Sequence, residues 1–310
     1  MIDTLKNFDV RLLFRNLCYL CTRDLAADMR QPELRKEALY QRILHLPEPW
    51  ASAFREEIEY LKREGWAPFP YAQVRKLDRV ESGMDPDRGL PFVVHRGRRL
   101  YFPADWTERR AEEAYRGYVE NECLLGGGYR QKAPHQYQTE AFRVQEGDVV
   151  VDVGAAEGLF ALDVADQAGR IYLFECDPVW KEPLAATFAP FGDKVRIVNR
   201  RVGGGQSRGE VRLAEFLDRE AGRRFFLKMD IEGAEPAVVE ACRDFLVREA
   251  QVRLCCCTYH RQHDAERLES LLKGMGYQTA FSEGYVLFSR DRDLAKPYFR
   301  RGMIRAEKQP

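Results

Sequence analysis

The strongest constraint on the fold is the regular alternation of short apolar runs and helical segments after Val144. The first run, 148–154 (DVVVDVG), is short, rich in valine and bounded by turn residues, which is typical of a buried strand. Four similar runs follow, each separated from the next by a longer intervening segment, most of them amphipathic. Such alternation predicts a parallel sheet with helices on both faces. A chain of 310 residues with 45% hydrophobic residues can supply the core that this α/β fold needs.

The end of this region departs from the alternation. The runs 277–281 (YQTAF) and 285–289 (YVLFS) are separated only by Ser282, Glu283 and Gly284. A parallel crossover needs about a dozen residues, so a link of this length allows only antiparallel pairing. We therefore expect the sheet to end in an antiparallel hairpin.

The first part of the chain has a different character. Apolar spacing and turn residues predict helices over 8–28, 32–45, 50–65 and 107–125, and a hairpin near 91–103. We expect a mostly helical N-terminal domain over 1–132, an α/β domain over 133–290 and a basic C-terminal tail over 291–310.

A glycine-bracketed loop follows the first strand of the α/β region. Asp152 lies just before the turn, and Gly154 and Gly158 bracket it. Glycine lets a backbone turn tightly and approach a ligand, and the next helix offers free N–H groups at its N-terminus. Parallel sheets bind ligands at the carboxyl ends of their strands, where this loop lies. A plain strand-to-helix turn is the alternative interpretation.

Two further features indicate which ligand the loop binds. Glu175 closes the second strand, 23 residues after Asp152, where an acid can accept hydrogen bonds from both hydroxyls of a ribose. Ala156 occupies the place of the second glycine of a dinucleotide-binding motif, and that glycine serves to approach a pyrophosphate. S-adenosylmethionine contains a ribose and no pyrophosphate, so it suits the loop better than a nicotinamide cofactor. The predicted cofactor-binding residues are Asp152, Gly154, Ala155, Glu157, Gly158, Glu175 and Asp177.

Charged residues gather where the fourth strand ends, in FLKMDIEGAEP. Lys228 and Asp230 are expected to face the cleft, whereas Glu235 suits the first turn of a helix. His260 follows the fifth strand, at the same edge of the sheet, and could accept a proton from a hydroxyl. The predicted catalytic residues are His260, Asp230 and Lys228. Two alternatives stay open for His260: a hydrogen-bonded residue at a helix start, or a metal ligand together with Asp230, although we assign no metal site.

At this point the sequence resembles the FkbM-type methyltransferases. DVGAAEG, the acid of LFECDP, KMDIEGAE and CTYHRQHD occur in that family's order and spacing, and the resemblance extends from about Pro134 to Ser289. One departure is Ala156, where the family often has Asn. The resemblance implies a class I, Rossmann-like methyltransferase fold with a terminal antiparallel hairpin, S-adenosylmethionine as cofactor, and O-methylation of hydroxyls on small molecules or sugars.

Composition narrows the range of partners. Lys plus Arg equals Asp plus Glu at 49 each, which removes the usual electrostatic argument for nucleic-acid binding. The Asp/Asn-Pro-Pro-aromatic signature of amine-methylating enzymes is also absent after the fourth strand. We found no apolar stretch of the roughly 18–20 residues that span a bilayer and no signal peptide, so we expect a cytoplasmic protein with reduced cysteines and no membrane association. A non-catalytic module that binds S-adenosylmethionine or a nucleotide is the competing function, and the acceptor and oligomeric state stay open.

Overall fold

The computed structural model describes residues 32–204, 209–291 and 293–308. The helix expected over 8–28 lies outside this range. Among the described residues, no helix combines the length and apolar character needed to cross a bilayer.

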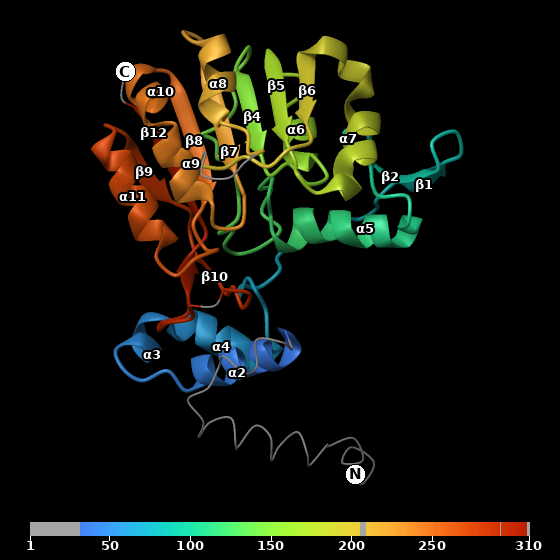
Figure 1. Ribbon diagram of the computed structural model, residues 1–310. Coiled ribbons are helices and arrows are strands. Elements are labelled where there is room, and N and C mark those ends of the chain that lie inside the picture. The colour runs from blue at the N-terminus through green and yellow to red at the C-terminus, as the bar shows by residue number, and fades with distance from the viewer. Residues whose placement is uncertain (1–31, 205–208, 292, 309–310) are drawn as a thin grey trace.

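A seven-stranded sheet forms the centre of the molecule (Figure 1). Its strand order is β6-β5-β4-β7-β8-β12-β9. The strands are β4 (Val149–Val153), β5 (Arg170–Phe174), β6 (Val195–Val198), β7 (Phe225–Met229), β8 (Val252–Cys257), β9 (Gln278–Phe281) and β12 (Met303–Glu307). Strands β4 to β8 pair in parallel, whereas β12 is antiparallel to both β8 and β9. This order and the reversed strand confirm the expected α/β class I methyltransferase fold.

The reversed strand is not the one predicted from the sequence. Tyr285–Val286 (β10) leaves the main sheet and pairs with Arg300–Arg301 (β11) in a separate two-stranded sheet. The antiparallel partner of β9 is β12, which lies in the segment expected to be a basic tail. Burial explains the difference, because the side chains of Met303 and Ile304 are completely buried between β8 and β9.

The basic residues that suggested a tail have partners inside the protein. Arg300 is 4% exposed and forms an ion pair with Asp291 at 2.8 Å. Arg305 donates hydrogen bonds to the backbone carbonyls of Gln136 and Tyr137. Paired in this way, the guanidinium groups of Arg300 in β11 and Arg305 in β12 are compatible with strands packed inside the protein.

Helices cover both faces of the sheet, as the alternation predicted. One face carries α8 (Leu213–Leu217), α9 (Glu235–Ala241), α10 (Arg243–Arg248) and α11 (Asp264–Gly274). The other carries α5 (Glu108–Arg116), α6 (Leu159–Asp163) and α7 (Lys181–Phe188). Alternation along the strands divides the two cores: Cys255 and Cys257 contribute to the second face, and Cys256 to the first.

The N-terminal part begins with α2 (Pro32–Leu44), α3 (Trp50–Ala53) and α4 (Arg55–Glu64), which lie below the sheet in Figure 1. These helices share a small core with the 285–299 segment, in which Phe54 stacks on Phe299 at 4.5 Å between ring centroids. The expected hairpin is present as β2 (Leu90–His95) and β3 (Arg98–Tyr101), and β1 (Ser82–Asp85) adds a third strand.

The helix expected from Thr107 is α5, with Thr107 accepting a hydrogen bond from the Arg110 N–H at its start. It continues into a π-helical turn over Gly117–Asn121, a feature often found at functional sites. Residues between 80 and 144 belong to the same apolar core as one face of the sheet. The domain boundary at 132/133 stays a prediction.

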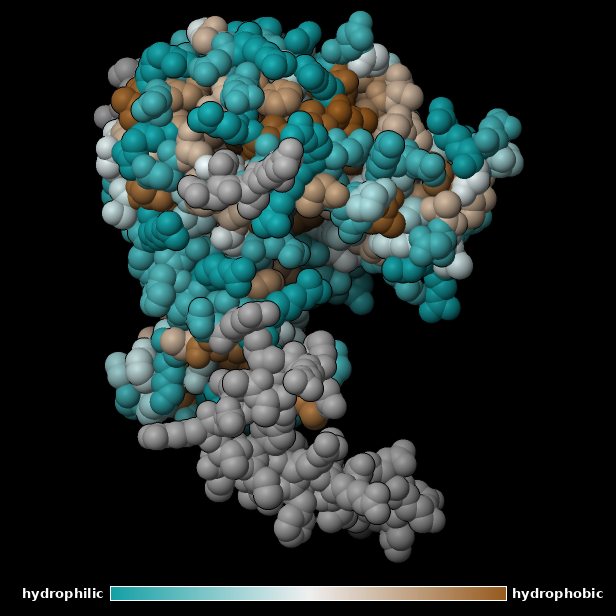
Figure 2. Space-filling model, in the orientation of Figure 1, coloured by the Kyte–Doolittle hydropathy of each residue, from teal (hydrophilic) through white to brown (hydrophobic). Residues whose placement is uncertain are grey.

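The face seen in Figure 2 is mainly hydrophilic, with hydrophobic areas interspersed. Among the described residues, the exposed large apolar side chains are Val74, Met84, Val179 and Val247. They come from four separate parts of the chain, and we assign no docking surface to them.

Candidate functional site

The turn after β4 brings the backbone of two strands into close contact. Gly154 has φ +80, and a Cβ at this position would lie 1.9 Å from the carbonyl oxygen of Asp230. Ala156 also has a positive φ of 45, a region that Asn enters more readily than Ala. The Asn that the FkbM family often carries here therefore suits the backbone conformation. Gly154 is required for the packing of β4 against β7 as well as for any ligand contact.

Glu175 joins this turn to the end of β5. One of its carboxylate oxygens accepts the Ala156 N–H at 2.8 Å, and the other accepts the Asp177 N–H at 2.7 Å. A carboxylate has about four lone-pair sites, so two backbone bonds leave capacity for hydroxyl donors. The carboxylate is thus held in place while it can still accept hydrogen bonds from a ligand.

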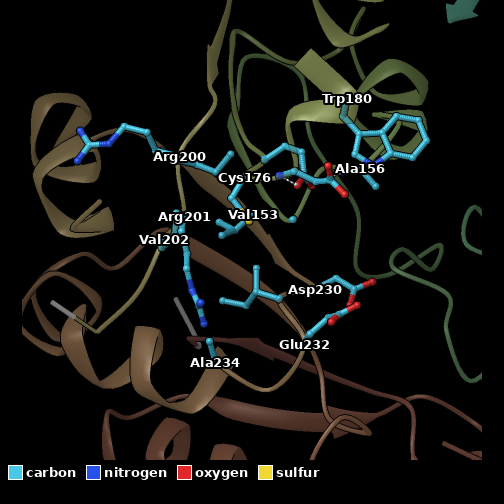
Figure 3. A pocket seen from close by; sticks show the side chains of 15 residues that line it. Val153, Ala156, Cys176, Trp180, Arg200, Arg201, Val202, Asp230, Glu232 and Ala234 are labelled. Carbon is cyan, nitrogen blue, oxygen red and sulfur yellow. Dashed lines mark hydrogen bonds between the residues drawn. The ribbon is translucent and has the colours of Figure 1, made fainter. Parts of the chain in front are cut away.

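Glu175 and the turn line a cavity of about 500 Å³ at the carboxyl ends of the strands, here termed the larger cavity (Figure 3). Its lining is Val153, Gly154, Ala156, Phe174, Glu175, Cys176, Asp177, Trp180, Arg200, Arg201, Val202, Asp230, Ile231, Glu232 and Ala234. In Figure 3, Trp180 and Ala234 lie at opposite ends, and the Arg200 side chain extends away from the other sticks. Three predicted cofactor residues, Gly154, Glu175 and Asp177, are in this lining, together with the catalytic candidate Asp230.

A second cavity of about 140 Å³, the smaller cavity, lies on the other side of the Gly154–Ala156 turn. Its lining is Tyr118, Glu122, Leu124, His135, Tyr137, Gly154, Ala155, Ala156, Glu157, Phe160, Lys228 and Asp230. Gly154, Ala156 and Asp230 line both cavities. The two cavities are therefore adjacent at the ends of β4 and β7.

The predicted cofactor residues divide between these spaces. Gly154, Glu175 and Asp177 line the larger cavity, whereas Ala155 and Glu157 line the smaller one. Asp152 and Gly158 line neither of the two. Gly158 caps α6 with φ +84, and its missing Cβ leaves room for Phe188.

Asp152 is completely buried and paired with Lys228, whose Nζ lies 2.8 Å from its carboxylate. Lys228 also donates a hydrogen bond to the Gly154 carbonyl at 2.5 Å. Burial opposes the charge on Lys228, but Asp152 and Asp230 raise its pKa above the ordinary range. Lys228 therefore stays protonated and anchors the turn, a role distinct from proton transfer.

Asp230 lies between two histidines. His135 Nε2 is 3.3 Å from one of its oxygens and His260 Nε2 is 3.4 Å from the other. Burial alone would raise the pKa of Asp230, but the hydrogen bond from His135 and the charges of His135, His260 and Lys228 hold it well below its ordinary value. Asp230 is thus an ionised carboxylate that faces both cavities.

His260 is 4% exposed and lines neither of the two cavities. Its Nδ1 lies 2.9 Å from Glu235, which is in the first turn of α9 as expected and also accepts the N–H groups of Ile231 and Gly233. Burial favours the neutral ring, but the hydrogen bond to Glu235 and the charge of Asp230 raise the pKa of His260. The ring is enclosed between two carboxylates, behind Asp230 as seen from the cavities.

Sequence reasoning missed His135, the histidine that does line a cavity. Its Nδ1 lies 3.0 Å from Glu122, at the end of the π-helical turn. Burial works against its charge, but hydrogen bonds with Asp230 and Glu122 outweigh this and raise the pKa of His135 to about 9. No local pattern marks His135, because it precedes β4 in an irregular segment and meets Asp230 only through the tertiary fold.

Comparison with known proteins gives the family. Residues 194–279 match the family model described as Methyltransferase FkbM domain. Over these residues the chain matches an FkbM-type methyltransferase domain, as the resemblance implied. No curated protein matches the chain.

Similar solved structures share the methyltransferase description at low identity. A precorrin-6y C5,15-methyltransferase from Geobacter metallireducens is 17% identical over 54% of this chain and 82% of its own, with a TM-score of 0.37. An rRNA methylase from Streptococcus thermophilus is 13% identical over 54% and 90%, with a TM-score of 0.35. A putative methyltransferase from Streptococcus mutans, solved with SAH, is 11% identical over 54% and 91%, with a TM-score of 0.35. The family model is the finding that identifies the domain.

The cofactor of this FkbM-type methyltransferase is S-adenosylmethionine, and the larger cavity fits it. Glu175 can accept hydrogen bonds from the ribose, and Trp180, Val202 and Cys176 offer contacts for the adenine. The turn over 154–157 faces the junction of the two cavities, where the methionine end would lie. The bound cofactor supplies a methyl group already activated by its sulfonium.

Proposed function

We propose that this FkbM-type methyltransferase O-methylates a hydroxyl of a small molecule or sugar. The observation that carries the proposal is the junction of the two cavities at Asp230. A cofactor in the larger cavity can present its methyl group there to an acceptor in the smaller one. The enzyme then contributes mainly alignment of the two reacting groups and removal of a proton.

The smaller cavity favours a hydroxyl acceptor. Asp230, His135 and Glu157 surround it with groups that accept or exchange protons, and about 140 Å³ suits a compact group such as one end of a sugar or small alcohol. A hydroxyl placed there can donate a hydrogen bond to Asp230. This fit is the reason to retain a small-molecule acceptor over a nucleic acid.

The geometry leads us to propose different roles for the two histidines. His135 lines the smaller cavity and can take the hydroxyl proton directly, whereas His260 contacts the acceptor side only through Asp230. We therefore propose His135, in the neutral form that predominates above about pH 9, as the proton acceptor and His260 as a residue that positions Asp230. Lys228 holds the Gly154 carbonyl and thereby the turn that separates the cavities.

A methyl-labelling experiment tests the proposal. The full chain is incubated with methyl-labelled S-adenosylmethionine and a cell extract divided into small-molecule, RNA and protein fractions. We expect label in the small-molecule fraction, in a methyl ether formed at a hydroxyl. Label confined to RNA or protein would contradict the proposed acceptor class, and tight cofactor binding without transfer would favour the non-catalytic alternative.

Variants then separate the histidines. We expect His135→Gln to lower kcat by about 10²–10⁴-fold, the usual contribution of general-base catalysis, while cofactor affinity changes only a few-fold. The exposed His263→Gln is the matched control and should keep full turnover. Full turnover in His135→Gln, with loss in His260→Gln, would restore His260 as the base.

A further inference from the structure

One nitrogen of His135 is surrounded by other possible metal ligands. Asp230 Oδ2 lies 3.3 Å from His135 Nε2, Cys257 Sγ lies 3.4 Å from it, and the hydroxyl of Tyr259 also lies at 3.4 Å. His135, Cys257 and Tyr259 are all buried, whereas Asp230 reaches both cavities. His135 comes from the segment before β4, Asp230 from the end of β7 and Cys257 from the end of β8. The fold therefore sets the relative positions of these three residues.

These separations match those around a tetrahedral ion. With zinc–nitrogen and zinc–oxygen bonds near 2.0–2.2 Å and a zinc–sulfur bond near 2.3 Å, tetrahedral angles place N and O ~3.3 Å apart and N and S ~3.5 Å apart. The distances from His135 Nε2 to Asp230 and Cys257 are 3.3 and 3.4 Å. The ligand atoms of all three residues lie within 4.8 Å of one another.

A second carboxylate orients the ring for this role. Glu122 Oε2 lies 3.0 Å from His135 Nδ1, so Nδ1–H can donate to Glu122 while an ion takes the place of the Nε2 proton between His135, Asp230 and Cys257. Metal-binding histidines usually donate their other N–H to a carboxylate or carbonyl in this way. Glu122 belongs to the smaller cavity and follows directly after the π-helical turn.

The cluster around His260 lacks this arrangement. Asp230, Glu235 and His260 also lie close together, but Asp230 faces one ring nitrogen and Glu235 the other. An imidazole between two carboxylates cannot direct one lone pair at an ion that both carboxylates share. Both oxygens of Glu235 are also occupied by backbone N–H groups.

We infer that His135, Asp230 and Cys257 bind a zinc-like divalent ion whose fourth coordination position opens into the smaller cavity. This inference rests on the proposed function and changes one step of it. An acceptor hydroxyl in the fourth position would bind the ion through its oxygen, and the ion would lower the pKa of that hydroxyl as it does for bound water. The hydroxyl proton would then leave to solvent water, in place of transfer to His135.

Cobalt(II) is a suitable probe, because a thiolate ligand gives it a charge-transfer absorption that oxygen and nitrogen ligands do not. The full chain should carry Cys18→Ser, Cys21→Ser and Cys176→Ser, which removes two cysteines outside the described residues and one exposed thiol. After treatment with a chelator, the protein is titrated with Co²⁺ and then with Zn²⁺. We expect one equivalent of Co²⁺ to bind per chain and to give the thiolate band. One equivalent of Zn²⁺ should then displace the Co²⁺ and remove the band.

Cys257→Ser should abolish the thiolate band and weaken zinc binding at least 100-fold. Cys255→Ser is the matched control, because Cys255 lies two residues away on the same face of β8 and is equally buried. This variant should keep the thiolate band and the affinity for zinc. Glu122→Gln should weaken zinc binding about 10–100-fold, the usual effect of losing such an outer partner. Circular dichroism checks that each variant is folded.

A wild-type chain without stoichiometric binding, or a thiolate band that survives in Cys257→Ser, would overturn the inference. Metal binding and methyl transfer are measured separately, so the two proposals can fail separately. Stoichiometric zinc without transfer to a hydroxyl would leave the metal site and reject the proposed function. Transfer to a hydroxyl by a chain that binds no stoichiometric zinc would reject the metal site and leave His135 as the base.

Discussion

At the scale of single residues, the site depends on carboxylates held by backbone N–H groups and by buried cations. Glu175 accepts two N–H groups, and Asp152 faces the buried ammonium of Lys228. These bonds fix the carboxylates before any ligand binds. Preorganisation of this kind lowers the entropic cost of binding and of aligning the reacting groups.

Glu175→Ala should weaken binding of S-adenosylmethionine by roughly 1.5–3 kcal/mol, because it removes hydrogen bonds from the ribose to a charged acceptor. Isothermal calorimetry measures the affinity. The matched control is Glu182→Ala, an exposed acid in α7 that does not line the larger cavity and should bind normally. Unchanged affinity in Glu175→Ala would remove Glu175 from the cofactor site.

Glu157 should make stability fall as the pH rises. Burial raises the pKa of Glu157 to about 7, above the 4.5 of an exposed glutamate. Between these values the folded chain holds a proton that the unfolded chain has lost, so the free energy of unfolding decreases with pH and becomes level above about 7.

Glu157→Gln removes this titration. We therefore expect the free energy of unfolding of Glu157→Gln, relative to wild type, to increase from pH 4.5 to pH 7 by up to about 3 kcal/mol. Urea denaturation at a series of pH values provides the measurement. Parallel pH dependences in the two proteins would show that Glu157 titrates as an exposed residue.

At the scale of elements, the site depends on how closely β4 and β7 approach at their ends. Gly154 brings the β4 turn against the Asp230 carbonyl, and Lys228 on β7 donates a hydrogen bond back to the Gly154 carbonyl. A side chain at position 154 would meet backbone atoms of Asp230, so the two strands would have to separate. A substitution there therefore disturbs the fold as well as the cofactor cavity.

Gly154→Ala should therefore destabilise the fold by about 3 kcal/mol or more, the sum of a positive-φ penalty and overpacking, and should abolish cofactor binding. Gly147→Ala is the matched control: it has φ +81 but nothing within 4 Å of an added Cβ, and should lose only about 1–2 kcal/mol. Thermal unfolding compares the two. Equal losses would mean that the approach of β4 to Asp230 is not limiting.

At the scale of the whole molecule, the last residues of the chain complete the sheet. Strand β12 lies between β8 and β9, and its buried Met303 and Ile304 contribute to the two opposite cores. The preceding segment packs against the N-terminal helices through Tyr298 and Phe299. The C-terminal segment thus joins the sheet to α2–α4.

A chain that stops after Gly302 should fail to fold, because it loses β12, which leaves β9 without a partner and one edge of β8 unpaired. Burial of Met303 and Ile304 alone is worth about 1.5–3 kcal/mol each. A chain that stops after Glu307 keeps the whole strand and should fold and bind the cofactor. Solubility and circular dichroism distinguish the two, and a folded, cooperative 1–302 chain would show that β12 is dispensable.

The sequence alone determined the parallel part of the sheet and several of the residues that line the larger cavity. Valine-rich runs are too apolar to lie anywhere but between layers of helices, and acids or glycines directly after them must lie at the carboxyl edge of the sheet. Gly154, Glu175 and Asp230 were identified for this reason, and each lines the larger cavity. The FkbM assignment from KMDIEGAE and its neighbours is likewise confirmed by the family model.

Only the tertiary structure decided which strand reverses and which histidine lines the smaller cavity. Local spacing favoured 285–289 as the partner of β9, but the choice depends on which segment can bury both faces between β8 and β9, and that requires contacts across the chain. His135 is separated from Asp230 by 95 positions, and no pattern near either residue indicates that they meet. Periodicity reports which face of an element is buried, whereas contacts between distant segments are set by the packing of the complete core.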